Sequence, residues 1–414
     1  MSVAVTMFNG GRGAASIARG MLVTPGVDLS LVVNGYDNGH STGALRRYLP
    51  GMLGPSDFRK NLLLHLDPAD PAQAALATVL EHRLPAGATP AGLTEVIEAV
   101  AARRGRFAAL PEEASALVAA HLRAFARRLA AAPQGFDLAD CALGNLVFAG
   151  AYLRLGRDFN AAVDACARAF GSPVRLLNVT NGENAFLVAL RRDGTLLADE
   201  ADIVAPRDQR RPQATITDLF LLREPVGGRR RAELEASPPE WARDDLLEDR
   251  AEVTPNPRAL EAIRNADLIV YGPGTPHSSL LPSYLTPGVA DAVARSRAAA
   301  KVFVVNTRDD HDSRGLSAPD LVDRTLAYLG DPGNRRRLVT HVLSHQGPDA
   351  AAGAEATPGV PTVPHGVLGR GEWAGARWLT ADLEDPGHPG AHHGRRTAEA
   401  LLAIRHEAAL AGAR

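Results

Sequence analysis

The sequence is poor in cysteine, lysine and aromatic residues. Among 414 residues it has two cysteines, two lysines and 5% aromatic side chains. Because Cys141 and Cys166 are too few for a disulfide framework, we expect a reducing compartment. Arginine replaces lysine, and the basic residues total 45 against 47 acidic ones. Since no positive charge is in excess, no nucleic-acid partner is expected.

Long apolar runs are also absent. No uninterrupted run approaches the roughly 20 residues that cross a bilayer. The first residues lead directly into a glycine turn, without the charged start and long apolar stretch of a signal peptide. We therefore expect a cytoplasmic protein with no membrane partner. With 45% hydrophobic residues, the chain can still bury a large core.

The chain instead contains short apolar strands that alternate with glycine turns and helices. Residues 3–8 and 29–33 are predicted strands, and a helix is predicted at 14–21 between them. Residues 267–271 and 301–306 are β-branched and almost continuously apolar, as buried parallel strands are. This pattern predicts an α/β fold with a Rossmann-like, mostly parallel sheet that carries helices on both faces.

A helical segment interrupts this alternation. Apolar residues recur at helical spacing near residue 120, and we predict a helical insertion at 67–134 within a single domain of residues 1–414. A further helix pair is predicted at 138–170. Residues 223–257 lack clear periodicity and are predicted to form a connection or lid.

The remaining segments are predicted as short strands, a loop and a last helix. Strands are expected at 176–180, 185–190 and 195–199, with a hairpin turn at Asp193-Gly194. Residues 347–375 are interrupted by glycine and proline and are predicted to be a loop. The last helix is expected at 395–411.

The first polar loop follows the first strand. Gly10, Gly11, Arg12 and Gly13 stand where a strand ends and a helix begins. Glycine allows backbone amides to approach an anion, and a helix N-terminus adds a partial positive charge. The loop is neither a Walker loop nor a full dinucleotide fingerprint, and a purely structural turn is the alternative.

The second polar loop follows the second strand. Asp37, Asn38, Ser41 and Thr42 supply a carboxylate, an amide and two hydroxyls. This set suits Mg²⁺ or a ribose. The alternative is that Asp37 or Ser41 only caps a helix beginning near Ala44.

Two further loops complete the set. Asp57 and Arg59 lie in a predicted loop at 54–59, and such a pair is often only an exposed ion pair worth at most about 1 kcal/mol. The loop at 272–279 follows an apolar strand and offers free amides and hydroxyls. Because ligands of open α/β sheets bind at the carboxyl ends of the strands, we expect the four loops to converge there on an anion and a metal.

These loops, in this order, resemble the CofD-like family, which includes 2-phospho-L-lactate transferases and the gluconeogenesis factor YvcK. The matching segments are residues 10–13, 37–43, 54–59, 143–146, 266–274 and 301–306. The helical insertion and the last hundred residues match less well.

The resemblance implies a Mg²⁺-dependent transfer of a phospholactyl-like group from a guanosine diphosphate donor to an alcohol. Asp37 and Asp57 would hold the metal, and Arg59 would offset phosphate charge. Asn145 and Asn306 would orient the donor or acceptor. The remaining candidate ligand-binding residues are Gly10, Gly11, Arg12, Gly13, Asn38, Ser41, Thr42, Gly272, Gly274, Thr275, His277 and Ser278.

The resemblance leaves a second function open, since another branch of the family consists of non-catalytic regulators that bind UDP-sugars. His277 stands where that branch has a tyrosine, which disfavours a UDP-sugar. Asn38 stands where many relatives have a second acid, which removes one metal ligand. A dehydrogenase is disfavoured because no ribose-binding acid follows the first loop at the usual spacing. We expect a nucleotide-activated small-molecule substrate and a homodimer.

Overall fold

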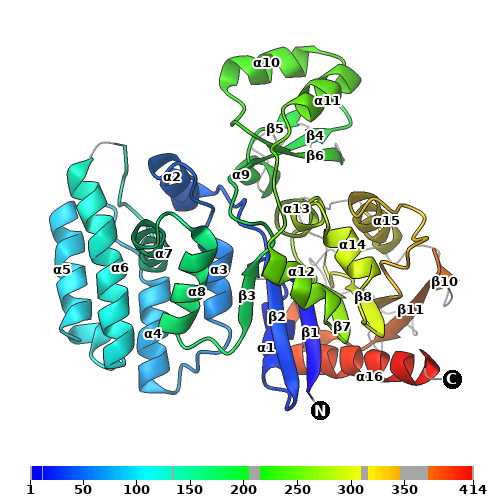
Figure 1. Cartoon of the computed structure of the whole chain (residues 1–414), viewed down its shortest axis with the longest axis horizontal. Helices are drawn as coiled ribbons and strands as arrows, with labels where there is room; N and C mark the ends of the chain where they lie inside the picture. The colour runs from blue at the N-terminus through cyan, green and yellow to red at the C-terminus, as the bar shows by residue number, and fades with distance from the viewer. Residues whose placement is uncertain are drawn as a thin grey trace. The chain divides into compact units, whose positions relative to one another are not determined.

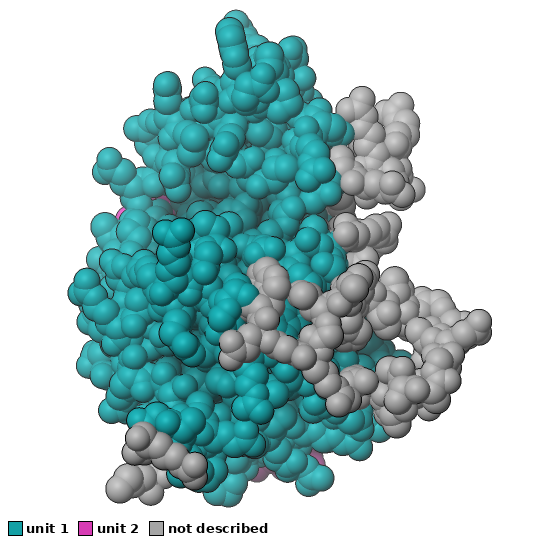
Figure 2. Space-filling view, turned by 90° about the vertical axis from the view of Figure 1, so that its right-hand side faces the viewer, with its two compact units in different colours: residues 1–34, 179–181, 185–414 teal, residues 35–178, 182–184 magenta. Residues whose placement is uncertain are grey.

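The computed structural model describes residues 2–11, 13–132, 135–204, 215–308, 316–345 and 372–412. The chain forms two compact units (Figure 2). Unit 1 consists of residues 1–34, 179–181 and 185–414, and unit 2 consists of residues 35–178 and 182–184. Arg12 and nearly all of the loop predicted at 347–375 lie outside the described residues. No helix in the described part of the chain has the length and apolarity to span a membrane.

Unit 1 is built on a mostly parallel sheet (Figure 1). Within it the strand order is β10-β11-β9-β8-β7-β1-β2, and β10 alone in this set pairs antiparallel. The strands are β1 (Val3–Phe8), β2 (Val27–Val33), β7 (Leu268–Tyr271), β8 (Ala300–Val304), β9 (His341–His345), β10 (Glu372–Trp373) and β11 (Ala376–Ala381). The predicted Rossmann-like sheet is confirmed, and every residue of β7 and β8 is buried, as parallel strands covered on both faces require.

Helices flank this sheet in Figure 1. They are α1 (Ala15–Leu22), α12 (Pro257–Arg264), α13 (Leu281–Tyr284), α14 (Val289–Ala294), α15 (Ala318–Tyr328) and α16 (Gly394–Gly412). Glycines allow α1 and α16 to pack closely, because a Cβ atom on Gly20 would lie 2.3 Å from the carbonyl oxygen of Gly394. The last predicted helix is confirmed as α16, whereas β9 and β11 were not predicted.

Unit 1 also contains a three-stranded antiparallel sheet in the order β5-β4-β6. Its strands are β4 (Phe186–Arg191), β5 (Leu196–Leu197) and β6 (Ile216–Leu222), and α9 (Glu200–Val204) follows β5. The predicted hairpin turn joins β4 to β5, with Gly194 at φ +82°. A second hairpin, β12 (Glu384–Asp385) with β13 (His388–His392), was not predicted.

The segment at 223–257, which showed no clear periodicity, contains two helices. They are α10 (Gly228–Ala236) and α11 (Pro239–Glu248). Leu234, Ala242 and Leu246 join one hydrophobic cluster with side chains of the three-stranded sheet. Each helix has so few buried positions that its sequence contains no repeating apolar pattern, which explains why the helices were missed.

Unit 2 is helical. Its elements are α2 (His40–Tyr48), α3 (Ser56–Leu62), α4 (Pro71–Glu81), α5 (Pro90–Ala101), the 3₁₀ turn η1 (Gly105–Phe107), α6 (Glu112–Ala131), α7 (Leu143–Arg154), α8 (Phe159–Ala169) and the strand β3 (Arg175–Asn178). The helices predicted within 67–134 and 138–170 are confirmed. The unit is wider than the predicted insertion, since it begins at Gly35 and includes α2 and α3.

The predicted loop at 54–59 is wrong, because Ser56 begins helix α3. Pro55 holds the N-cap position with φ −85°, and Asp57 lies in the first turn, where a carboxylate interacts favourably with the helix dipole. Arg59 and Lys60 lie in the last turn, where positive charge is favourable. The glycine and proline that indicated a loop therefore only precede the helix.

A close contact between α6 and α7 depends on Gly150. A Cβ atom at this position would lie 1.8 Å from the carbonyl oxygen of His121. We expect Gly150→Ala to lower the free energy of unfolding by about 1–3 kcal/mol, because a backbone atom cannot yield as a flexible side chain can. Urea denaturation followed by circular dichroism measures the change.

Gly92 on α5 is the matched control. A Cβ atom there would meet only the side chain of Thr89, at 3.6 Å. Gly92→Ala should be neutral or stabilising by about 0.4–1 kcal/mol, because alanine reduces the entropy of the unfolded chain. Equal destabilisation by both substitutions would contradict the proposed close contact.

Candidate functional site

The predicted site residues fall into two groups, one in each unit. Unit 2 contains Asp37, Asn38, Ser41, Thr42, Asp57, Arg59 and Asn145. Unit 1 contains Gly10, Gly11, Gly13, Gly272, Gly274, Thr275, His277, Ser278 and Asn306. The structure brings members of each group together, and the two groups are described separately.

In unit 2, the backbone of residues 35–37 lies against Gly54. The Gly54 amide donates to the carbonyl oxygen of Gly35 at 2.7 Å. A Cβ atom on Gly54 would lie 2.4 Å from the carbonyl oxygen of Asp37, so no other residue fits here without a shift of the backbone. This contact brings Asp37 next to the start of α3, which carries Ser56 and Asp57.

Asp37 does not cap helix α2. The helix begins at His40, earlier than predicted, and its N-cap is Gly39 without a side-chain cap. The Asp37 carboxylate accepts a hydrogen bond from the Gly39 amide at 2.9 Å within the preceding loop. Asn38 lies close to Gly43, whose Cβ would meet the Asn38 carbonyl oxygen at 2.4 Å. Because α2 begins at His40, Ser41 and Thr42 lie in its first turn.

Ser56 is at the centre of the group in unit 2. Its hydroxyl lies 2.7 Å from Thr42 Oγ1 and 3.4 Å from Asn145 Nδ2, and it hydrogen-bonds the Asp37 side chain. Asn145 is buried, and its Oδ1 atom has no hydrogen-bond partner. Ser56 was not among the residues predicted from the sequence, although its position directly before Asp57 in a matching segment was a usable signal.

The two carboxylates of this group influence each other. Burial raises the pKa of Asp37, and the negative charge of Asp57 raises it further. The Gly39 hydrogen bond, Lys60 and Ser56 act in the opposite direction. Lys60 Nζ forms an ion pair with Asp57 at 2.8 Å. The charged form of Asp37 is therefore disfavoured in this group, and a bound cation would stabilise the charged form.

The Arg59 guanidinium hydrogen-bonds the backbone, whereas the Asp57 carboxylate pairs with Lys60. Arg59 is 8% exposed, and its guanidinium donates to the carbonyl oxygen of Leu80 at 3.0 Å. Burial and then Arg83 lower the pKa of Arg59, while Glu81, Asp57 and Asp37 act in the opposite direction. Its Nε atom is buried without a hydrogen-bond partner. The alternative prediction, an exposed ion pair between Asp57 and Arg59, is wrong, because both residues are buried and Asp57 pairs with Lys60.

The donor set in unit 2 suits a hard cation. Two carboxylates, two hydroxyls and the unpartnered amide oxygen of Asn145 are oxygen ligands, and Mg²⁺ sites in proteins typically use one or two carboxylates together with water and phosphate. No cluster of three or more histidine, cysteine or acidic side chains at metal-binding distance exists among the described residues. The residues therefore fit a weakly held Mg²⁺ better than a tightly bound transition metal.

In unit 1, the loops after β1 and β7 meet because the two strands are neighbours in the sheet. A Cβ atom on Gly13 would lie 2.5 Å from Gly274 Cα, and one on Gly272 would lie 2.7 Å from the carbonyl oxygen of Phe8. The glycines are thus required for close contact of the two loops. The predicted convergence of residues 10–13 with 272–279 is confirmed for the described residues.

Asn306 fastens the loop after β7. It follows β8, and its Nδ2 atom donates to the carbonyl oxygen of Gly274 at 3.0 Å. Its Oδ1 atom accepts from the Gly274 amide at 3.2 Å. This pair of hydrogen bonds shows that Asn306 fixes the conformation of the glycine loop. It adds a third strand end to the site.

A short π-helical turn, Pro276–Leu280, follows the glycine loop, where sequence analysis predicted loop as far as residue 279. Thr275 is its N-cap. His277 is completely buried, with Nε2 3.2 Å from a nitrogen of Arg324. Ser278 Oγ is buried without a hydrogen-bond partner. Ser278 is thus a candidate ligand-binding residue, whereas the His277 ring lies inside the protein.

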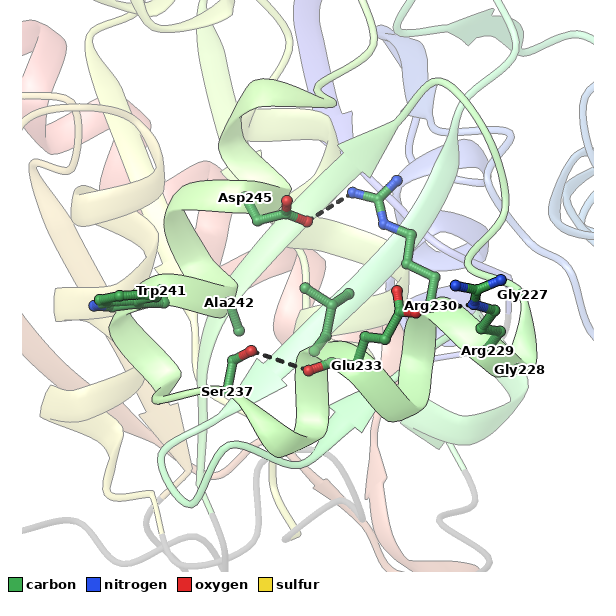
Figure 3. A pocket seen from close by; sticks show the side chains of 10 residues that line it. Gly227, Gly228, Arg229, Arg230, Glu233, Ser237, Trp241, Ala242 and Asp245 are labelled. Atoms are coloured by element: carbon green, nitrogen blue, oxygen red, sulfur yellow. Dashed lines mark hydrogen bonds and ion pairs between the residues drawn. The ribbon is translucent and has the colours of Figure 1, made fainter.

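One surface cavity lies apart from all of these residues. It has a volume of about 660 Å³ and lies between α10 and α11 (Figure 3). Its charged side chains are paired, with Arg229 2.9 Å from Glu233 and Arg230 2.8 Å from Asp245. Trp241, 70% exposed, lies at its edge. The pairing leaves little charge to attract a phosphate.

We expect Asp37→Asn to stabilise the metal-free protein at neutral pH. Because its folded-state pKa is raised above the unfolded value of about 3.9, Asp37 imposes a cost that is absent below that pH and grows as pH rises through the raised pKa. Asparagine removes the charge and keeps an oxygen for the Gly39 amide. The melting temperature, measured in EDTA between pH 4 and 7.5, should rise most at the upper end.

Glu95→Gln, on the exposed face of α5, is the matched control and should change little. A lower melting temperature for Asp37→Asn than for the wild type at pH 7.5 would show that the Asp37 charge is stabilised by its surroundings.

Known proteins are similar to this chain over most of its length. A gluconeogenesis factor from Halalkalibacterium halodurans is 25% identical over 328 residues, which cover 79% of this chain and 74% of that protein. One from Bacillus subtilis is 24% identical over 302 residues, covering 73% and 67%. A crystal structure of a Bacillus halodurans protein superposes with a TM-score of 0.64 at 20% identity, covering 97% of this chain and all of that chain, and so supports the fold alone. The family model for 2-phospho-L-lactate transferase CofD matches residues 5–365, and the chain therefore belongs to the CofD family.

Proposed function

We propose that the protein is a Mg²⁺-dependent transferase that moves a phospho-acid group of the 2-phospholactyl type from a nucleoside-diphosphate-activated donor to an alcohol. The observation that carries this proposal is the pair of carboxylates in unit 2. Asp37 and Asp57 are close enough to repel each other and are surrounded by oxygen donors. Family membership supports a phosphate-containing ligand.

The metal would be held by Asp37 and Asp57. Ser56 and Asn145 lie beside Asp37 and Thr42, and they orient the donor set through the hydrogen bonds around the Ser56 hydroxyl. A bound Mg²⁺ supplies neutralisation of the charge that develops on the leaving phosphate. Lys60, paired with Asp57, adds a positive charge that limits the repulsion between the carboxylates.

The phosphates would be held in unit 1. The glycine loops that contain Gly10, Gly11 and Gly13 and Gly272 and Gly274 follow adjacent parallel strands, and glycine-rich loops at such strand ends are suited to anions. Asn306 keeps the Gly274 loop in one conformation, and Ser278 offers a hydroxyl. The acceptor hydroxyl attacks phosphorus in line, and the nucleoside monophosphate leaves, so no nucleophilic side chain is required.

A second candidate function is a non-catalytic sensor of UDP-sugars. The names of the matching relatives favour a regulator over a transferase, because those from Halalkalibacterium halodurans and Bacillus subtilis are called gluconeogenesis factors. A sensor of this kind would bind its ligand without releasing a nucleoside phosphate. The donor set in unit 2 suits either function, since a metal can also bind the diphosphate of a nucleotide-sugar.

Thermal shift with GDP, GTP, UDP and UDP-sugars, each with and without Mg²⁺, separates the two functions. For a transferase we expect the guanine nucleotides to stabilise the protein, by about 2.7 kcal/mol when the ligand is at one hundred times its dissociation constant. Stabilisation by UDP-sugars alone would contradict the transferase and support the sensor.

Asp57→Asn should remove the Mg²⁺-dependent part of the ligand-induced shift. The substitution keeps the shape of the side chain while removing one of the two carboxylates. Glu95→Gln is again the control and should leave the shift intact. If the Asp57→Asn protein keeps the full Mg²⁺-dependent shift, Asp57 is not a metal ligand.

A further inference from the structure

A second cavity in unit 1 is lined by none of the predicted site residues. It is lined by β6, α11 and α15 and has a volume of about 710 Å³ (the three elements are labelled in Figure 1). Pockets that bind small molecules are typically about 300–1,000 Å³. The cavity is therefore large enough for a small organic ligand.

The lining combines apolar side chains with an excess of arginine. Leu219, Phe220 and Leu316 are buried and contribute apolar surface. Four arginines line the cavity, against three aspartates. Such a mixture suits a ligand with an apolar body and an anionic group.

The carboxylates of the cavity are mostly engaged. Asp218 pairs with Arg243 at 2.9 Å. The Asp320 carboxylate accepts from the Ser317 amide at 2.8 Å and lies 2.6 Å from its hydroxyl, in the capping box of α15. Burial and then Asp320 raise the pKa of Asp323, so its negative charge is disfavoured.

Three arginines of the cavity consequently have no carboxylate within ion-pair distance among the described residues. They are Arg192, Arg250 and Arg324. Burial lowers the pKa of the half-buried Arg324, and Arg192 lowers it further, while Tyr328, Asp320 and Asp218 act in the opposite direction. A guanidinium that stays positive at any physiological pH remains there, next to another arginine. An anion would reduce this repulsion.

Arg324 also connects the cavity to the glycine loop. Its NH1 atom donates to the carbonyl oxygen of Ile216 at 2.5 Å and lies 3.2 Å from His277 Nε2. His277 belongs to the π-helical turn that begins two residues after Gly274. A guanidinium that turns toward a ligand in the cavity must weaken its contact with His277.

We propose that this cavity binds a small organic anion with an apolar body through Arg192, Arg250 and Arg324, and that binding alters the turn at Pro276–Leu280. The cavity is then an effector site. The effect on phosphate binding by the adjacent glycine loop rests on the proposed function, whereas ligand binding in the cavity and the change in the turn do not.

Isothermal titration of the full chain with phenyl phosphate tests the binding. This probe has an aromatic body and a phosphate, and we expect one molecule to bind per chain, more tightly than inorganic phosphate. Arg192→Gln combined with Arg250→Gln should weaken binding at least tenfold. Arg229→Gln, a change to an arginine on α10 whose side chain is 94% exposed, is the control and should not weaken it.

Two results would overturn the site. One is the absence of phenyl phosphate binding to the wild type at millimolar concentration. The other is equal affinity in the wild type and the Arg192→Gln, Arg250→Gln double variant, which would place the probe elsewhere, for example at the glycine loops.

Hydrogen exchange of the peptide spanning 272–280 tests the connection without any nucleotide. We expect phenyl phosphate to change its protection in the wild type and not in Arg324→Met. Because Arg324→Met also loses the bond to Ile216, the Arg192→Gln, Arg250→Gln double variant is the second test and should likewise show no change. Unchanged protection in a wild-type protein that binds the probe would refute the coupling. If no nucleotide stabilises the protein in the thermal-shift screen, the titration and the hydrogen-exchange measurement still test the cavity and its coupling to the turn, because neither uses a nucleotide.

Discussion

The close approach of two backbone turns at the ends of β1 and β7 determines the geometry of unit 1. Adjacent parallel strands end at the same edge of a sheet, and here Gly13 and Gly274 touch with no space for a side chain on Gly13. The backbone hydrogen bonds of the parallel ladder set the spacing of the two strands, and the last four residues of β1 and all of β7 are buried. The turns therefore consist of glycine backbone without side chains, which is typical of loops that bind anions.

Unit 2 uses a different principle, in which charged side chains are brought together at a cost. The contact of Gly54 with the Asp37 carbonyl places one carboxylate beside the helix that carries the other. Burial and repulsion then disfavour the charged form of Asp37, and Lys60 offsets only part of this. An arrangement of charges that disfavours the charged form of Asp37 does not help folding, and it therefore supports the proposed role in ligand binding.

Much of unit 1 was predictable, because its strands are short and apolar, and glycine follows β1, β2 and β7 within two residues. β1, β2, β7 and β8 and the turns after them follow from local sequence alone. β9 and β11 did not, since His341–His345 and Ala376–Ala381 contain polar residues, and only their neighbours in the sheet identify them as strands. The helices α10 and α11 were missed because each buries too few residues to show a period.

Some of the candidate site was also predictable from the sequence, and some was not. Asp37, Asp57 and Asn145 were predicted from the sequence because their residue types carry obvious chemistry, but Ser56, whose hydroxyl contacts the side chains of Asp37 and Asn145, was not. Residues 54–59 were also predicted to be a loop, because Gly54 and Pro55 are typical of loops. In the structure the glycine is needed for a contact with Asp37 and the proline precedes a helix. Such roles depend on which backbone lies opposite, and a single sequence does not contain that information.

Asn306 and His277 illustrate how the protein controls the glycine loop from outside it. Asn306 binds both polar atoms of the Gly274 backbone, so the strand end of β8 fixes the loop from one side. His277, in the following turn, is completely buried and contacts Arg324 from α15. The first contact involves backbone and a short amide side chain, and leaves little freedom. The second depends on a long arginine that also faces a cavity, and this makes it the point at which the loop can respond to a second ligand.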